Sequence, residues 1–209
     1  MSDNAYTPEA APAPRQGRPS ASSSCEPGST CRLRLSFSIF FDGTRNSKYQ
    51  DIADGSHSNV ARLFEVCEER PNKGVYRLYV QGVGTSFADI GEPVPHEHGA
   101  SMGAMGAPRI RYALLYVANQ FAIKVARRPL VPESPRSIAA AVSTESLLPR
   151  WRRQLTHMLT ASQNPKIDEI VFDVFGFSRG ATAARSFIHQ LKRSFCDVDG
   201  IFCGCLFFL

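Results

Sequence analysis

The chain has 209 residues, of which 43% are hydrophobic, and a formal net charge of +5. This length suffices for one globular domain with a sizeable core. The positive charge comes largely from scattered arginines, without lysine-rich runs or interleaved aromatic residues, so we expect no nucleic-acid partner. The six cysteines are not spaced as zinc ligands, and we expect no metal and no cofactor.

Both ends of the chain differ in composition from its middle. Residues 1–30 are rich in Pro, Ala and Ser and lack apolar periodicity, which predicts a disordered tail. No signal peptide precedes this tail, so we expect the protein to be made and folded in the cytoplasm. Residues 196–209 are an apolar tail that is too short to span a bilayer. The folded unit is therefore expected over residues 31–195.

Apolar periodicity along this unit alternates between strand and helix. The predicted elements, in chain order, are a strand at 33–41, a helix from Ser58 or Asn59 to Pro71, a strand at 75–80, a glycine-rich loop at 82–107, a helix from Pro108 to about Val125, a helix around Trp151–Leu159 and a strand at 170–175. Strands separated by helices indicate a mostly parallel sheet flanked by helices. The fold class is therefore α/β, with the element order of part of an α/β-hydrolase.

The third predicted strand ends in Gly176-Phe-Ser-Arg-Gly180, a G-x-S-x-G pattern that opens into a helical pattern. A serine hydroxyl becomes a nucleophile when a sharp strand-to-helix turn holds it out of regular structure. Gly176 and Gly180 remove the side chains that would clash at such a turn. We therefore predict that Ser178 is the catalytic nucleophile and that the N–H of Arg179 contributes to an oxyanion hole. The alternative is a glycine-punctuated turn with an inert serine.

A second candidate site element follows the first predicted strand. The carboxyl ends of parallel strands share one edge of the sheet, so Asp42-Gly43-Thr44 should lie near Ser178. Backbone N–H groups of Gly43 and Thr44 would complete the oxyanion hole, and Asp42 would contact substrate. The alternative is a strand-ending turn in which Asp42 accepts hydrogen bonds from local amides.

Five blocks of sequence carry a resemblance to one family. They are Phe40–Asn46, Ser58–Phe64, Tyr79–Thr85, Gly103–Ala107 and Gly176–Ala181. In this order they resemble the catalytic domain of type VI secretion phospholipase effectors, the first family of type VI lipase effectors, over residues 33 to 192. The resemblance implies an α/β-hydrolase fold, a Ser-Asp-His triad and hydrolysis of phospholipid acyl esters. It also implies a phospholipid membrane as substrate, export by a type VI system, a secretion spike carrier and an immunity protein.

The chain departs from this family pattern after the nucleophile. In the α/β-hydrolase order the acid and the histidine follow the serine on later strands. His189 lies on the helix after Ser178, about three turns (~16 Å) along it, and cannot fold back. Asp197 and Asp199 follow without an intervening strand or a later histidine. We therefore expect a C-terminally truncated or frameshifted enzyme that is nearly inert as written.

Other interpretations of these residues stay open. The chain could be a catalytically silent fragment or interaction domain that retains the hydrolase scaffold, or an esterase for small soluble esters. His96-Glu97-His98 in the glycine-rich loop could bind a cation, but no further ligand is placed by sequence, so a solvated loop or substrate lid is the preferred interpretation.

Overall fold

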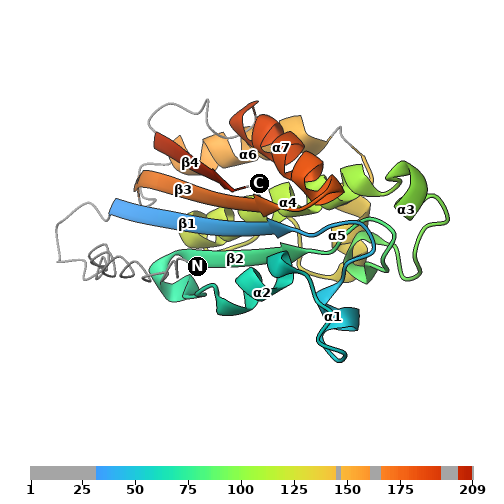
Figure 1. Ribbon diagram of the computed structural model, residues 1–209. Helices are drawn as coiled ribbons and strands as arrows, with labels where there is room; N and C mark the ends of the chain where they lie inside the picture. The colour runs from blue at the N-terminus through green and yellow to red at the C-terminus, as the bar shows by residue number, and fades with distance from the viewer. Residues whose placement is uncertain (1–31, 145–146, 161–165, 194–201, 209) are drawn as a thin grey trace, which may run out of the picture.

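The computed structural model describes residues 32–144, 147–160, 166–193 and 202–208. The elements alternate between strands and helices, as Figure 1 shows. They are β1 (Arg32–Phe41), α1 (Lys48–Asp51), α2 (Asn59–Val66), η1 (Pro71–Lys73), β2 (Val75–Val80), η2 (Ala88–Ile90), α3 (Gly99–Met102), α4 (Gly106–Ala126), α5 (Pro135–Val142), α6 (Leu147–Thr160), β3 (Lys166–Gly176), α7 (Arg179–Leu191) and β4 (Phe202–Phe208). The α/β fold expected from the sequence is confirmed.

The sheet is parallel throughout its described strands, in the order β2-β1-β3-β4. β1 is central and bonds to both β2 and β3, with Phe41 opposite Val80 on one side and Gly176 on the other. These three residues end their strands at one edge of the sheet. The loops after β1, β2 and β3 therefore converge at the right-hand edge in Figure 1.

Helices cover the two faces of the sheet unequally. On one face α4 and α7 pack against the strands, and α5 and α6 pack against α4. The main core lies there, and its β1 contribution is Leu35, Phe37, Ile39 and Phe41, the alternate residues of a strand. On the other face α2 packs on β1 and β2 and covers a smaller cluster that contains Phe40. Because both faces are covered near the carboxyl ends, β1 becomes continuously apolar there.

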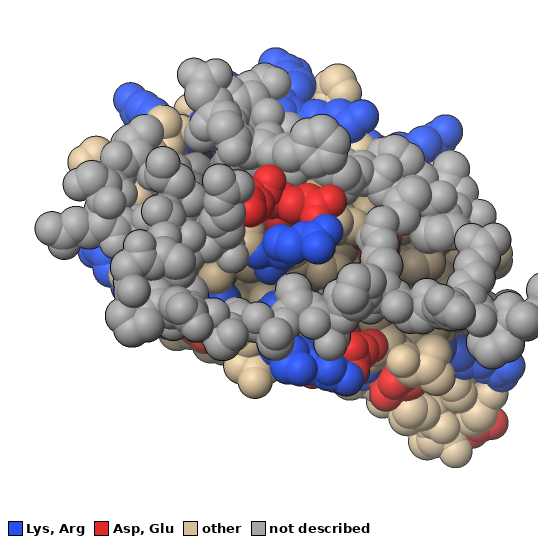
Figure 2. Space-filling model, turned by 90° about the vertical axis from the view of Figure 1, so that its left-hand side faces the viewer, with Lys and Arg blue, Asp and Glu red and all other residues tan. Residues whose placement is uncertain are grey.

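The amino ends of the strands form the opposite edge of the sheet. Lys and Arg side chains lie among Asp and Glu side chains on the described part of this face (Figure 2). One such contact is the hydrogen-bonded ion pair between Arg34 of β1 and Glu169 of β3. Such exposed pairs contribute about 0–1 kcal/mol. Charge of both signs at this edge gives no indication of an anionic or cationic ligand.

Several elements differ from the sequence prediction. α2 ends at Val66 instead of running to Pro71, because the carbonyls of Phe64 and Cys67 accept hydrogen bonds from the Arg77 guanidinium. α5 begins at Pro135, between two predicted helices, where no element is predicted from the sequence. Phe202–Phe208, expected to be part of an apolar tail, is strand β4 and pairs with β3. The predicted tail at 1–30 lies outside the described residues.

Among the described helices, none combines the length and the apolar composition needed to cross a membrane.

Candidate active site

Ser178 lies between β3 and α7 in a backbone conformation that regular structure does not use. Its φ is 55° and its ψ is −125°, and it is the N-cap residue of α7. Met105 and Arg127 also have positive φ, but their ψ values of 10° and 20° fall in the ordinary left-handed region. The conformation of Ser178 is of the kind that costs about 1–3 kcal/mol and clusters at functional sites. The side chain makes no capping hydrogen bond and the residue is exposed.

The tightness of this turn requires both flanking glycines. A Cβ at Gly180 would lie 2.3 Å from the carbonyl oxygen of Phe41 and 2.4 Å from that of Asp42. A Cβ at Gly176 would lie 2.7 Å from the Cα of Ala181. We call residues Gly176–Gly180 the elbow. Its backbone packs directly against the end of β1, and the N–H of Phe177 donates to the Phe41 carbonyl at 3.2 Å. The two turns expected to meet at this edge do so.

Asp42 organises the turn after β1 from a buried position. Its side chain accepts hydrogen bonds from the Gly43 N–H at 2.7 Å and the Asn46 amide at 3.3 Å through Oδ1. Oδ2 accepts from the Ser58 hydroxyl at 2.7 Å and the Tyr79 hydroxyl at 2.5 Å. Asp42 is 2% exposed. This network fits the local-capping interpretation of Asp42, and direct contact with substrate stays a prediction that the burial disfavours.

Burial also affects Tyr79, the buried donor in this network. Desolvation raises the pKa of the Tyr79 hydroxyl, and its hydrogen bond to Asp42 raises that pKa further. The hydroxyl therefore stays protonated at neutral pH and donates to Asp42, while it accepts from the N–H of Lys48 at 2.9 Å. Tyr79 links the turn after β1 to the start of α1.

The candidate oxyanion donors differ in their availability. The Gly43 N–H is already bonded to the Asp42 carboxylate. In the described part of the chain no hydrogen bond is found for the N–H groups of Thr44 and Arg179. The Thr44 hydroxyl oxygen is buried and also lacks a partner among the described residues. Of the three predicted donors, Thr44 and Arg179 therefore remain the better candidates, because an oxyanion donor must be free to meet the substrate.

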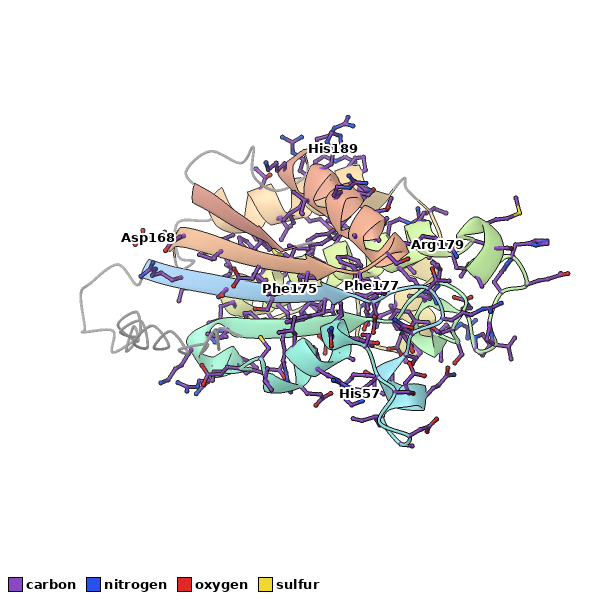
Figure 3. The ribbon with its side chains drawn as sticks, in the orientation of Figure 1. His57, Asp168, Phe175, Phe177, Arg179 and His189 are labelled. Carbon is purple, nitrogen blue, oxygen red and sulfur yellow. The ribbon has the colours of Figure 1, made fainter. Side chains whose placement is uncertain are left out.

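Two of the histidines can be placed relative to the turn at Ser178. His189 projects from the far end of α7 relative to Arg179 (Figure 3), as expected from its spacing. Asp168 lies at the opposite end of β3 from Phe175. His57 precedes α2 and lines a cavity together with Phe175, Gly176 and Phe177. Asp197 and Asp199 lie outside the described residues.

The glycine-rich loop between β2 and α4 is held by a buried ion pair to α4. Arg109 of α4 forms an ion pair with Glu92 at 2.5 Å, and both side chains are 3% exposed. The same guanidinium donates to the carbonyls of Gln81, Thr85 and Met105. Desolvation lowers the pKa of the Arg109 guanidinium, whereas Glu92 opposes that change. The base of the loop is therefore anchored.

The tip of this loop holds the two histidines that could bind a cation. His96 and His98 are exposed, and the N–H of His98 donates to Nδ1 of His96 at 3.2 Å. Within the described ranges no three His, Cys, Asp or Glu side chains are grouped as metal ligands. The tip therefore offers no assembled metal site.

No protein-family model matches the chain, and no curated protein matches it. Among solved structures, the chain is similar to the crystal structure of an uncharacterized protein from Pseudomonas aeruginosa, with a TM-score of 0.65 and 26% sequence identity. The alignment covers 77% of this chain, and the chain spans 26% of the length of that protein. The similarity supports the fold and names no activity.

Proposed function

We propose that this chain carries the nucleophile of a serine hydrolase that cleaves phospholipid acyl esters, with Ser178 forming the acyl-enzyme. The observation that carries the proposal is the backbone of Ser178, strained at φ 55° and ψ −125° between two glycines that tolerate no Cβ. Strain of this kind persists only where the surrounding structure holds it. Here it presents an exposed hydroxyl at the carboxyl edge of a parallel sheet, where ligands of such folds bind.

The resemblance of five sequence blocks to type VI secretion phospholipase effectors supplies the substrate and the partners of the proposal. It implies a phospholipid membrane as substrate, export by a type VI system, a spike carrier and an immunity protein. Exposed apolar side chains beside the nucleophile are consistent with a lipid substrate, since Phe177 is 58% exposed and Leu63 is 47% exposed. An esterase for small soluble esters would not need them.

A non-catalytic scaffold is the second candidate, and the position of His189 favours it. A triad histidine must reach the serine hydroxyl, at about 2.6–3.2 Å, to accept its proton. His189 is exposed at the distal end of α7. A chain without such a base would turn over slowly, because loss of a triad histidine costs on the order of 10⁶ in kcat. A stoichiometric assay of acylation is therefore sharper than a turnover assay.

The test is acylation of Ser178 by p-nitrophenyl esters, read by mass spectrometry of the peptide that contains it. The serine oxygen bonds to the carbonyl carbon, the ester bond to p-nitrophenolate breaks, and the hydroxyl proton passes to solvent. We expect one acyl group on Ser178 and none at that peptide in Ser178→Ala. Thr182→Ala, which removes an exposed hydroxyl one turn further along α7, should acylate like the unsubstituted chain.

The ester used separates the candidates. Faster acylation by the dodecanoate than by the butyrate ester, with Ser178-dependent release of fatty acid from phosphatidylglycerol vesicles, supports the phospholipase. A preference for butyrate supports the small-ester enzyme. If the unsubstituted chain acquires no acyl group at Ser178, the nucleophile proposal is wrong and the scaffold alternative stands.

A further inference from the structure

A cavity of about 470 Å³ opens beside the elbow, between the start of α2 and the end of β3. We call it the α2 cavity and define it by its lining residues, of which the argument uses His57, Arg62, Leu63, Phe175 and Phe177. Its volume lies within the usual range for ligand sites, about 300–1,000 Å³. It is far larger than a site for one structural water, which takes up about 30 Å³.

The floor of the α2 cavity is a fixed aromatic surface. The Phe175 ring stacks on Phe40, with centroids 4.6 Å apart and planes 5° from parallel. Phe40 in turn meets the edge of Phe64 at 5.6 Å, and both are buried in the cluster under α2. The Phe175 ring is therefore held in place and does not collapse into the cavity.

The cavity has apolar side chains at its opening and is lined by Gly176 and Phe177, the two residues before Ser178. Leu63 and Phe177 are two of the largest apolar exposures near it, at 47% and 58%. Phe177 directly precedes Ser178, and its ring occupies the space that a Cβ on Gly43 would need, at 2.7 Å. A hydrocarbon chain in the cavity would therefore lie against Phe177, the residue before Ser178.

The polar part of the lining carries positive and neutral groups. In the described part of the chain no acidic side chain lines the cavity, whereas Arg62 and His57 do. The Nδ1 atom of His57 is buried and has no hydrogen-bond partner among the described residues. This atom is closed to solvent, so it is the remainder of the His57 ring that lines the cavity. The lining therefore combines an apolar wall with groups that suit a negatively charged head.

We propose that the α2 cavity binds a single hydrocarbon chain with an anionic head, and that Leu63 and His57 select this ligand. The inference rests on the proposed function only for the link between this ligand and the acyl group of the substrate. Binding itself requires no chemistry at Ser178 and can be measured without it.

The experiment titrates the full chain carrying Ser178→Ala with cis-parinaric acid, a fatty acid whose fluorescence rises in an apolar site. We expect saturable binding that Leu63→Asp weakens at least tenfold. Val66→Asp is the matched control, because Val66 lies on the same helix, is 81% exposed and does not line the cavity. It should change the dissociation constant less than twofold. Thermal unfolding of both variants establishes that they fold alike.

Displacement of parinaric acid by three amphiphiles of equal chain length tests whether the cavity prefers an anionic head group. Dodecanoate and dodecyl phosphate should displace parinaric acid better than dodecanol, and the stronger of the two identifies the preferred anion. His57→Gln should reduce that advantage over dodecanol at least threefold. Equal weakening by Leu63→Asp and Val66→Asp, or no saturable binding, overturns the inference. Acylation of Ser178 without parinaric acid binding supports the proposed function and overturns the ligand proposal for the α2 cavity. Binding without acylation supports the ligand proposal and overturns the proposed function.

Discussion

The elbow at Ser178 and the glycine-rich loop after β2 lie at the same edge of the sheet, yet different forces hold them. The elbow is fixed by backbone atoms in contact, with Gly180 against the carbonyl of Phe41. The loop is held by a buried ion pair, in which the Arg109 guanidinium bonds to Glu92 and to three carbonyls, and by Phe87 and Ile90, which are buried in the main core. The elbow depends on glycines, which carry no Cβ, whereas the loop depends on a buried ion pair.

The largest expected effect breaks the loop restraint. Glu92→Gln leaves the Arg109 charge buried without its counter-charge, and removing one partner of such a pair destabilises by about 3–5 kcal/mol. We expect this loss in the free energy of unfolding measured by urea. Arg34→Ala is the control, because its ion pair with Glu169 is exposed and should contribute about 0–1 kcal/mol. Similar losses for the two variants would show that the Glu92 pair is not effectively buried.

The next effect breaks the elbow. Gly180→Ala places a Cβ within 2.4 Å of two backbone oxygens, so the backbone must shift, at a cost of about 1–3 kcal/mol or more. Acylation of Ser178 should be lost as well. Gly106→Ala is the matched control, since the nearest atom to its Cβ would be a Val83 methyl at an ordinary 3.7 Å. An unchanged unfolding midpoint for Gly180→Ala would contradict the packing of the elbow against β1.

The smallest effect has the opposite sign. Ser178→Gly relieves the backbone strain at φ 55°, whereas the greater entropy that glycine gains on unfolding offsets part of this relief. The net stabilisation of the protein should be about 1 kcal/mol. Ser178→Ala keeps a Cβ and should give no such gain, although both variants lose the hydroxyl. Calorimetric unfolding of the two variants side by side measures the difference. Equal midpoints would mean that the serine conformation carries no strain.

The contrast between these regions also explains what the sequence could predict. Glycine spacing around Ser178 encodes a steric requirement within five residues, and the sharp strand-to-helix turn expected from it is present between β3 and α7. The order of β1, α2, β2, α4, β3 and α7 was likewise predicted from local periodicity. The start of α5 also carries a local signal in the sequence, since Ser134 caps the helix and Pro135 occupies its first turn.

Contacts between distant residues were beyond sequence reasoning. The early end of α2 depends on Arg77, and the four donors around Asp42 include Ser58 and Tyr79 from other elements. Nothing near Asp42 in the chain indicates that these groups converge on it. The α2 cavity was not foreseen for the same reason, because its two walls come from α2 and β3.

The central position of β1 has a consequence for how the chain reaches this structure. Residues of β1 pair first with β2, close in sequence, and also with β3, where Arg34 and Glu169 are 135 residues apart. Joining such distant segments carries a large loop-closure entropy and slows folding. During synthesis from the N-terminus, β1 and β2 can therefore assemble while the second edge of β1 stays open for β3. The turn at Ser178 follows β3 directly, so it reaches this structure only after β3 has paired with the open edge of β1.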